Sequence, residues 1–203
     1  MRPLTDVLPK SMVPYKQDTL IGNNLTMLNQ NIPNIHVTVG YKKAMLSSYL
    51  MERGVDTIIN TEGHGNAWWI SHTVMRYVNA PVLVLTTDNI TELDFRFLEE
   101  EYQSLGEPAC MLVPVLPIPS IEGDYIEHEN GIVANVQRQT PHEIYCSGIQ
   151  VLNPAHVNII APELDDFYAI WNKLIEVKQL KVSNLYPKQW FSIDTLEQLA
   201  NLP

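Results

Sequence analysis

The chain has 203 residues, of which 45% are hydrophobic and 18% charged, so it can bury a sizeable core and lacks the composition of a disordered protein. Its formal net charge is −10, and its 13 basic residues are scattered along the sequence. Because proteins hold nucleic-acid backbones mainly with clustered lysine and arginine, this charge argues against a nucleic-acid partner.

The longest apolar runs, VLVLTT and CMLVPVLPI, are much shorter than the roughly 20 residues that a membrane-spanning helix needs. No basic segment followed by an apolar one marks a secretory signal. Cys110 and Cys146 lack the spacing of a metal site or a disulfide framework, and we expect buried thiols in strands. The sequence therefore predicts a soluble, cytoplasmic protein with no membrane partner.

The chain begins MRPLTDVLPKSMVPY, a polar segment interrupted by Pro3, Pro9 and Pro14. Proline removes a backbone donor and disfavours helix in the residue before it, so this segment is expected to be a shaped loop.

Helical and strand patterns alternate through the next hundred residues. Ile21, Leu25 and Leu28 form a helical stripe, and VLVLTT is apolar throughout, as in strands that are buried on both faces of a parallel sheet. The alternation predicts an α/β fold, a three-layer α/β/α Rossmann-like sheet with right-handed crossovers. Helices are predicted at 18–31, 42–53, 66–78 and 93–105, and strands at 35–40, 55–60, 82–87 and 109–116.

The helical pattern stops between Asp124 and Leu152, where short strands flank the turn at 128–131, whose Asn-Gly pair is a hairpin signal. Helix is expected again at 164–178, strand at 180–186, and a final helix from Thr195. Repeats and linkers are not evident. The sequence predicts a single domain, 1–203, with a small β-rich insertion at about 120–155 over one edge of the sheet.

Two aspartates follow apolar runs. Ligands of open α/β sheets bind at the carboxyl ends of strands, and Asp88 follows VLVLTT while Asp194 lies in WFSIDTLEQL. Carboxylates there are suited to a Mg²⁺ ion that is shared with phosphates. Asp88 could instead cap a turn, and Asp194 alone fits a structural role before the last helix, where Thr195 can cap and Gln198 lies in the first turn.

The segment TEGHGNA at 61–67 places two glycines where a strand passes into a helix. The backbone of such a segment can approach a flat ligand closely and offer N–H groups to an anion. A tight turn is an equal alternative. The segment matches neither the GxGxxG motif nor a P-loop. The histidines lack zinc spacing, and no nucleophile elbow or Cys–His pair supports a hydrolase. Charge neutralisation on phosphates is the chemistry that remains.

Several segments resemble, in chain order, motifs of the sugar-phosphate nucleotidyltransferases, also called nucleotide-sugar pyrophosphorylases. RPLTDVLPKSMVPY is similar to the second half of that family's opening motif, G-x-G-T-R-x-R-P-x-T followed by P-K-P, with Pro9-Lys10 matched and Ser11 in place of the second proline. IHVTVGY resembles the strand that ends V-G-Y, and Thr87-Asp88 stands where the family has G-D.

The resemblance continues to the end of the chain. Gly65-Asn66-Ala67 is similar to the G-T-A segment that receives the base. IYCSGIQVLNP, with Tyr145 and Gly148, resembles the sugar-site strand, and WFSIDTLEQL resembles the closing segment that carries the second metal aspartate.

The resemblance implies a nucleotide-diphospho-sugar transferase fold and transfer of NMP from an NTP to a sugar 1-phosphate, giving an NDP-sugar and pyrophosphate. It implies that Asp88 and Asp194 hold Mg²⁺ and that Lys10 neutralises phosphate charge. It also implies that Gly65, Asn66 and Ala67 seat the base and that Gly148 lets the sugar approach the backbone. The partners implied are thus an NTP and a sugar 1-phosphate.

Two departures limit what the resemblance carries over. We expect the family's first strand and G-x-G-T-R loop to be missing from this chain. The family's E-K-P is replaced by NVQRQT at 135–140, where Arg138 could reach a phosphate but the sugar-binding carboxylate is absent.

Three readings stay open at this point. The first is the sugar-phosphate transferase; the second is a non-catalytic relative that binds a nucleotide sugar or a partner protein; the third is a transferase with a phosphocholine-like acceptor. The base, the sugar and the oligomeric state, including a homo-oligomer, are left undecided by the residues.

Overall fold

The computed structural model describes residues 1–118, 121 and 123–200, and these fall into two compact units. Unit 1 comprises Met1–His64, Thr87–Thr91 and the segment from Phe191 onward, and unit 2 comprises Gly65–Thr86 and Glu92–Trp190. None of the helices in the described ranges has the length and apolar character of a membrane span.

Unit 1 is built on two parallel strands, β3 (His36–Val39) and β4 (Thr57–Asn60), which are joined through helix α3 (Lys43–Leu50). Helix α2 (Leu20–Asn29) is capped by Thr19, whose hydroxyl accepts the Gly22 N–H at 3.0 Å. The predicted apolar stripe of α2 is confirmed, because its residues join β3 and α3 in one core. The buried members of this core are Ile21, Leu25, Ile35, Val37, Val39, Leu46 and Leu50.

The start of the chain has more regular structure than the predicted loop. It contains helix α1 (Leu4–Val7), the 3₁₀ turn η1 (Lys10–Met12) and a hairpin of two short strands, β1 (Pro14–Tyr15) and β2 (Asp18–Thr19). A proline stands at the beginning of α1, η1 and β1 in turn. Its missing N–H is not needed at the start of an element, so these prolines begin short elements instead of preventing them.

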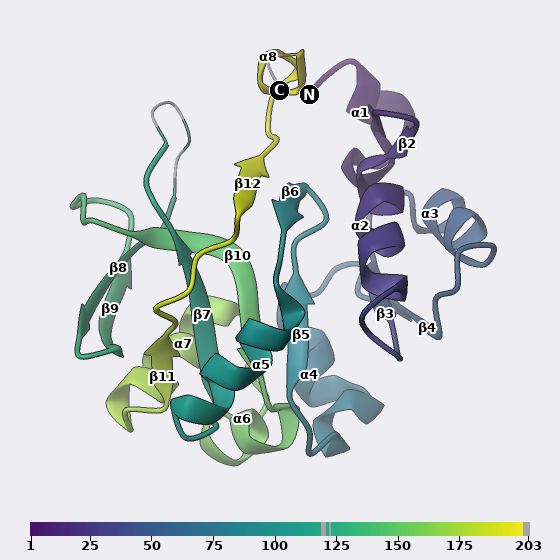
Figure 1. Cartoon of the computed structure of the whole chain (residues 1–203). Helices are drawn as coiled ribbons and strands as arrows, with labels where there is room; N and C mark the ends of the chain where they lie inside the picture. Colours follow the sequence, from purple (N-terminus) through teal and green to yellow (C-terminus); the bar gives the residue numbers. More distant parts are fainter. Residues whose placement is uncertain (119–120, 122, 201–203) are drawn as a thin grey trace. The chain divides into compact units, whose positions relative to one another are not determined.

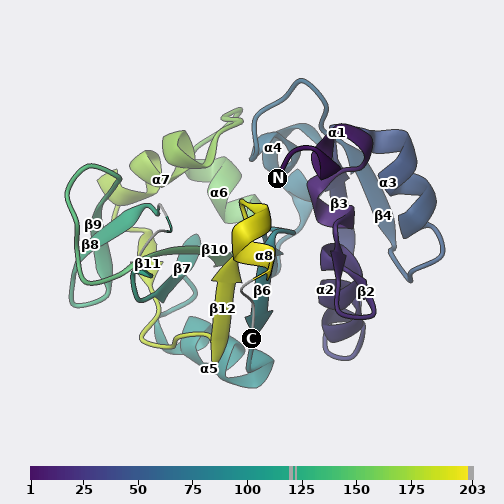
Figure 2. The same cartoon turned by 90° about the horizontal axis from the view of Figure 1, so that it is seen from above.

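Unit 2 contains a six-stranded mixed sheet with the order β5-β10-β7-β11-β9-β8. Strand β10 runs antiparallel to β5 and β7, whereas β11 runs parallel to β7. Helix α5 covers one face of the sheet, and α6 and α7 cover the other (Figures 1 and 2). The strands are β5 (Val82–Leu85), β7 (Cys110–Val115), β8 (Tyr125–Glu129), β9 (Ile132–Gln137), β10 (Tyr145–Leu152) and β11 (Leu180–Val182); the helices are α5 (Phe95–Ser104), α6 (Pro154–Ile160) and α7 (Phe167–Glu176).

This arrangement confirms the predicted α/β class with a mixed sheet. The hairpin is confirmed as well, because β8 and β9 pair antiparallel and both Asn130 and Gly131 have positive φ, the conformation that their turn requires. Cys110 is buried in β7 and Cys146 is half-buried in β10, both as free thiols. Burial raises the pKa of each thiol, so neither is poised as a nucleophile.

Two expectations about the elements are wrong, and one helix was not expected. Strand β5 lies at one end of the sheet order, antiparallel to β10 and half-buried at every position, and not inside a parallel sheet. The helix expected at 66–78 is divided into α4 (Trp68–His72) and the 3₁₀ turn η2 (Val74–Tyr77), because the Thr73 hydroxyl donates to Trp69 O and accepts from Met75 N–H. Helix α6 was not predicted, although Asn153 caps it and Pro154 opens it.

Candidate active site

Three of the predicted site residues meet within unit 1. The Lys10 ammonium donates to Asp88 Oδ2 at 2.7 Å and to Asp194 Oδ1 at 2.6 Å. In the sequence Lys10 lies 78 residues from Asp88 and 184 residues from Asp194. The fold therefore brings together the lysine and both aspartates, which we call the Lys10 cluster.

Lys10 is held in place by the η1 turn and the core beneath it. The Val13 N–H donates to Lys10 O at 3.1 Å, which closes the turn directly after Pro9. Val13 and Ile193 are fully buried and belong to one cluster with Leu20. Because Ile193 immediately precedes Asp194, this apolar cluster fixes the backbone of Lys10 beside that of Asp194.

Asp88 lies between β5 and a short strand, β6 (Asn89–Glu92), which pairs with β12 (Gln189–Ser192). Its carbonyl oxygen accepts the Ile193 N–H at 3.1 Å, and the buried Asn24 amide donates to the carbonyl of Asn89 at 3.2 Å. The backbone at Asp88 is thus fixed from two sides, which leaves its carboxylate available to Lys10. Strands β6 and β12 were both missed in the sequence.

The segment after Asp194 forms the predicted helix cap. Helix α8 (Leu196–Ala200) follows Thr195, whose hydroxyl accepts the Gln198 N–H at 3.1 Å. The Gln198 side chain in return accepts the N–H groups of Asp194 at 2.7 Å and Thr195 at 2.9 Å, as in a capping box. Since Thr195 and Gln198 cap the helix, the Asp194 carboxylate serves Lys10 instead of the helix end.

The Lys10 cluster carries more negative than positive charge, since two carboxylates share one ammonium. The side chains of Lys10, Asp88 and Asp194 are 32%, 28% and 58% exposed. Partial burial works against the charged form of Lys10, but the hydrogen bonds and charges of Asp194 and Asp88 outweigh it, so the pKa of Lys10 is raised. The ammonium stays charged at neutral pH, and the cluster is one positive charge short of balance.

The two carboxylates also have the chemistry of a divalent-cation site. Both present an oxygen within hydrogen-bonding distance of the same nitrogen, so the two oxygens face one point at which a cation is bound. Hard oxygen donors of this kind suit Mg²⁺. Across the described part of the chain, no group of three or more His, Cys, Asp or Glu side chains could hold a metal ion. A cation here would therefore complete its shell with water or with phosphate oxygens.

Gly65, Asn66 and Ala67 lie together in unit 2, packed against the start of α7. A Cβ atom at Gly65 would collide with the Asp165 carbonyl, and that carbonyl accepts the Ala67 N–H at 2.9 Å. The Asn66 side chain accepts the Phe167 N–H at 3.0 Å. The close approach that explains a glycine at position 65 is therefore one between two segments of the backbone, and the base-binding role of 65–67 stays a prediction.

Tyr145 and Gly148 both lie on β10, but in different settings. Tyr145 is 1% exposed, its hydroxyl accepts the Ile118 N–H at 3.1 Å, and its ring packs edge-on against Trp190. Gly148 has φ of 79° at the point where the register of β10 against β7 shifts, a conformation that favours glycine. Tyr145 is thus a core residue of unit 2, and the sugar-site roles of both residues stay predictions.

Arg138 is held by two residues that the sequence did not single out. Its guanidinium donates to the Asp124 carboxylate, and the Tyr168 hydroxyl donates to the same carboxylate. Burial, followed by this hydrogen bond, raises the pKa of Tyr168 to about 12, so the phenol remains a donor. We call these residues, Arg138, Asp124 and Tyr168, the Asp124 cluster; the Arg138 side chain is 64% exposed.

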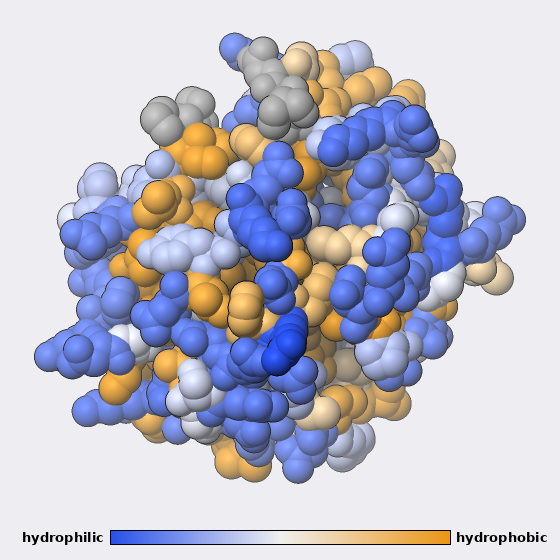
Figure 3. Space-filling view, viewed as in Figure 1, coloured by the Kyte–Doolittle hydropathy of each residue, from blue (hydrophilic) through white to orange (hydrophobic). Residues whose placement is uncertain are grey.

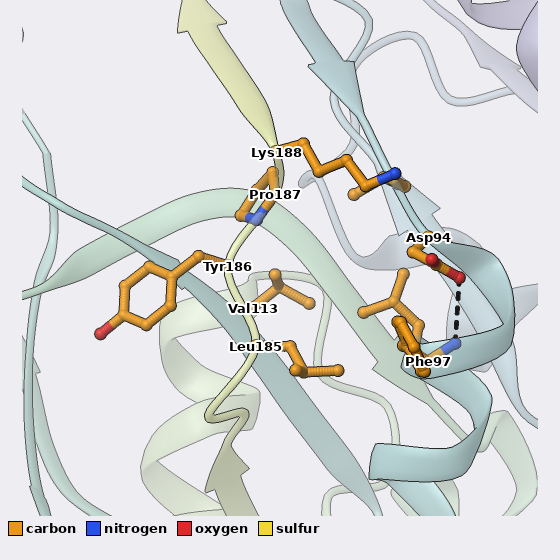
Figure 4. Close-up of a pocket in the computed structure, with 9 residues that line it drawn as sticks. Asp94, Phe97, Val113, Leu185, Tyr186, Pro187 and Lys188 are labelled. Atoms are coloured by element: carbon orange, nitrogen blue, oxygen red, sulfur yellow. Dashed lines mark hydrogen bonds between the residues drawn. The ribbon is translucent and has the colours of Figure 1, made fainter.

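Unit 2 also contains a small, mostly apolar cavity of about 110 Å³ (Figure 4). Asp94 lies at its wall, but that carboxylate caps α5 by accepting the Phe97 N–H at 3.3 Å. Phe97 and Tyr186 line this cavity and are 53% and 48% exposed. The face of the molecule in Figure 3 mixes hydrophobic and hydrophilic residues. Pockets for small molecules usually measure about 300–1,000 Å³. This cavity is therefore too small for a nucleotide.

Comparison with solved structures defines the class of fold. An inositol-1-phosphate CTP transferase from T. maritima matches with a TM-score of 0.74 at 14% identity, covering 98% of this chain and 85% of that one. A CTP:phosphocholine cytidylyltransferase from Streptococcus pneumoniae matches with a TM-score of 0.71 at 17% identity, covering 98% and 90%. The chain thus has the fold of nucleotidyltransferases.

Comparison of sequences finds relatives among the mannose-1-phosphate guanyltransferases. The chain is 27% identical to a mannose-1-phosphate guanyltransferase of Pichia angusta over 95% of its own length and 57% of the relative. It is 25% identical to the enzyme of that name from Saccharomyces cerevisiae over 79% of its length and 48% of the relative. No protein-family model matches, and the chain spans about half the length of these curated relatives. By sequence and fold together, it is related to the sugar-phosphate nucleotidyltransferases.

Proposed function

We propose that the protein transfers NMP from an NTP to a sugar 1-phosphate, giving an NDP-sugar and pyrophosphate, in nucleotide-sugar biosynthesis. The observation that carries this proposal is the Lys10 cluster. Two aspartates that the family motifs single out, far apart in the sequence, both accept a hydrogen bond from the Lys10 ammonium, at 2.7 and 2.6 Å. The sequence match to mannose-1-phosphate guanyltransferases supports the same activity.

In this reaction an oxygen of the sugar 1-phosphate attacks the α-phosphorus of the NTP, and the bond to pyrophosphate breaks. Such transfer depends on positioning and on stabilising the charge of the phosphates. Lys10 would neutralise developing phosphate charge, while Asp88 and Asp194 would hold Mg²⁺. The ion, when bound, would supply further positive charge, which an acidic chain needs to bind an anionic nucleotide.

The roles proposed for unit 2 rest on the family resemblance. Gly65, Asn66 and Ala67 would seat the base, and Gly148 would let the sugar approach the backbone. Arg138 would contact a substrate phosphate with those N–H groups that Asp124 does not occupy, for which its exposed guanidinium is suited. Tyr145 would shape the site from the core, because its hydroxyl already accepts a backbone N–H.

The printed names of the relatives suggest the first substrates to test. The sequence relatives are named for guanyl transfer to mannose 1-phosphate, so GTP with mannose 1-phosphate is the first pair. Phosphocholine and inositol 1-phosphate with CTP are the pairs named by two structural neighbours, which keeps a non-sugar acceptor as the alternative.

The test is pyrophosphate release by the purified chain with Mg²⁺, across four NTPs and these three acceptors. We expect release with one nucleotide–acceptor pair, and a loss of at least about 100-fold in Asp88→Asn, because the metal-binding charge is removed. Asp94→Asn is the matched control, since asparagine caps α5 as well as aspartate does. Silence with every pair would overturn catalysis and leave nucleotide-sugar binding, which titration calorimetry with GDP-mannose can measure.

A further inference from the structure

The position of the Lys10 ammonium suggests a second role for this residue. Its nitrogen lies 2.7 Å from Asp88 Oδ2 and 2.6 Å from Asp194 Oδ1, so it takes the point that both carboxylates face. We infer that Lys10 is a built-in counter-ion that competes with the divalent cation for Asp88 and Asp194. This inference rests on the proposed function, because it concerns the metal of that site.

The competition follows from geometry and charge. A Mg²⁺ ion binds carboxylate oxygens at about 2.0–2.1 Å, closer than an ammonium hydrogen bond, and it would use the oxygens that Lys10 now occupies. Two cations a few ångströms apart repel each other strongly at a partly buried site. Asp88 and Asp194 therefore cannot hold the metal while the ammonium stays between them.

Lys10 is built to move while its backbone stays fixed. Its carbonyl accepts the Val13 N–H in the η1 turn, and Val13 is fully buried. The side chain, however, is a flexible four-carbon stem that is 32% exposed. A nucleotide phosphate would give the ammonium a new acceptor, so the nucleotide would draw Lys10 from the carboxylates as the metal takes its place.

Such an exchange would make metal binding depend on the nucleotide. Without a phosphate that accepts the Lys10 ammonium, the metal must displace this ammonium from the carboxylates, so its net binding free energy is small. When a phosphate is present, the ammonium and the metal can both bind anionic oxygens at the same time. The free protein would thus keep its two neighbouring carboxylates neutralised in part and would bind divalent cations weakly.

Another lysine of unit 1 supplies a matched control. Lys43 pairs with Glu62 at 2.7 Å, a contact as short as those of Lys10, but it neutralises a single carboxylate. Replacing Lys43 removes the same charge without uncovering two converging carboxylates. The Lys43 variant therefore separates the effect of a general change in net charge from the effect of removing the ammonium that competes at Asp88 and Asp194.

The experiment is titration with Mn²⁺ alone, without nucleotide, followed by the electron paramagnetic resonance signal of the free ion. We expect Lys10→Met to bind one Mn²⁺ at least about tenfold more tightly than wild type, because a neighbouring positive charge is removed. Lys10→Arg, which keeps the charge, and Lys43→Met should both bind as wild type does. In the double variant Lys10→Met with Asp88→Asn, the gain should disappear.

Equal Mn²⁺ affinity in wild type and Lys10→Met would overturn the inference, as would an equal gain in Lys43→Met. Circular dichroism checks the fold, and Lys10→Gln offers a second neutral side chain if the methionine variant does not fold. The measurement needs no turnover. A protein that releases no pyrophosphate but shows the gain in Lys10→Met would contradict the proposed function alone, and an active protein without the gain would contradict the counter-ion alone.

Discussion

The Lys10 cluster of unit 1 and the Asp124 cluster of unit 2 both join carboxylates to a cation, but their proportions are opposite. In the first, two carboxylates share the ammonium of Lys10. In the second, the single carboxylate of Asp124 receives both the guanidinium of Arg138 and the hydroxyl of Tyr168. The first cluster is one positive charge short of balance, whereas the charges of the second cluster are balanced.

Exposure follows the same division. The Asp124 side chain is 17% exposed, whereas those of Asp88 and Asp194 are 28% and 58% exposed. A shielded carboxylate whose charge is balanced ties the β8–β9 hairpin to α7, which is a structural task. An accessible pair of carboxylates that shares one ammonium can accept a further cation. The ratio of cations to carboxylates, and not the presence of an ion pair, distinguishes the candidate site from a structural contact.

The largest effect that this comparison predicts is on turnover. Lys10→Met should lower kcat by about 100-fold or more, as expected when a charged group that stabilises the transition state is removed. Lys43→Met, which breaks a pair with one carboxylate, should leave kcat unchanged. Steady-state pyrophosphate release measures both. A similar loss in the two variants would mean that charge in general, and not the Lys10 cluster, supports the reaction.

The second prediction concerns stability, for which we expect the Asp124 cluster to matter more than the Lys10 cluster. Asp124→Ala should lower the free energy of unfolding by about 1–3 kcal/mol, because Arg138 and Tyr168 lose a shared acceptor. Asp88→Ala should cost under about 1 kcal/mol, since Lys10 keeps Asp194 and the pair is accessible to water. Urea unfolding followed by circular dichroism tests this. If Asp88→Ala were the more damaging change, the Lys10 cluster would be the structural one.

Part of the candidate site was accessible from the sequence. Asp88 and Asp194 each follow an apolar run, and the rule that ligands bind at strand ends selects both. Lys10 came from the family resemblance only. That its ammonium bridges the aspartates depends on the packing of Val13 against Ile193, which no local pattern contains.

The Asp124 cluster shows what could be added and what could not. The turn of the hairpin was predicted, but Tyr125 pairs with Gln137 only after a one-residue register shift between Glu127 and His128. The alignment of Asp124 with Arg138 therefore depends on a bulge that the turn does not reveal. Tyr168 comes from α7, whose position depends on the whole sheet. The errors in the fold have a similar origin. Strand β5 is a four-residue apolar run whose partner, β10, lies far along the chain, and β6 and β12 are too short for a clear period.

Asp18 sharpens the comparison from inside unit 1, because it resembles Asp124 and not Asp88. Its carboxylate accepts hydrogen bonds from the Arg53 guanidinium, the Tyr49 hydroxyl at 2.7 Å and the Thr19 N–H at 2.8 Å. These bonds, led by that of Arg53, lower the pKa of Asp18 below its ordinary value of 3.8. Because one guanidinium balances this one carboxylate, Asp18 should be structural.

The consequence is a small, pH-dependent loss of stability in acid. In the unfolded chain Asp18 takes up a proton near pH 3.8, whereas the folded form resists protonation until a lower pH. Its contribution is therefore present above pH 3.8 and is lost as the pH falls through the folded pKa. Asp18→Asn should be less stable than wild type at neutral pH, and the difference should shrink below pH 3.8. The urea midpoints of wild type and Asp18→Asn at neutral and acidic pH measure this. If the difference between the two midpoints were the same at both pH values, Asp18 would stabilise the fold through packing instead of charge. The contrast between Asp18 and Asp88 would then have no electrostatic basis.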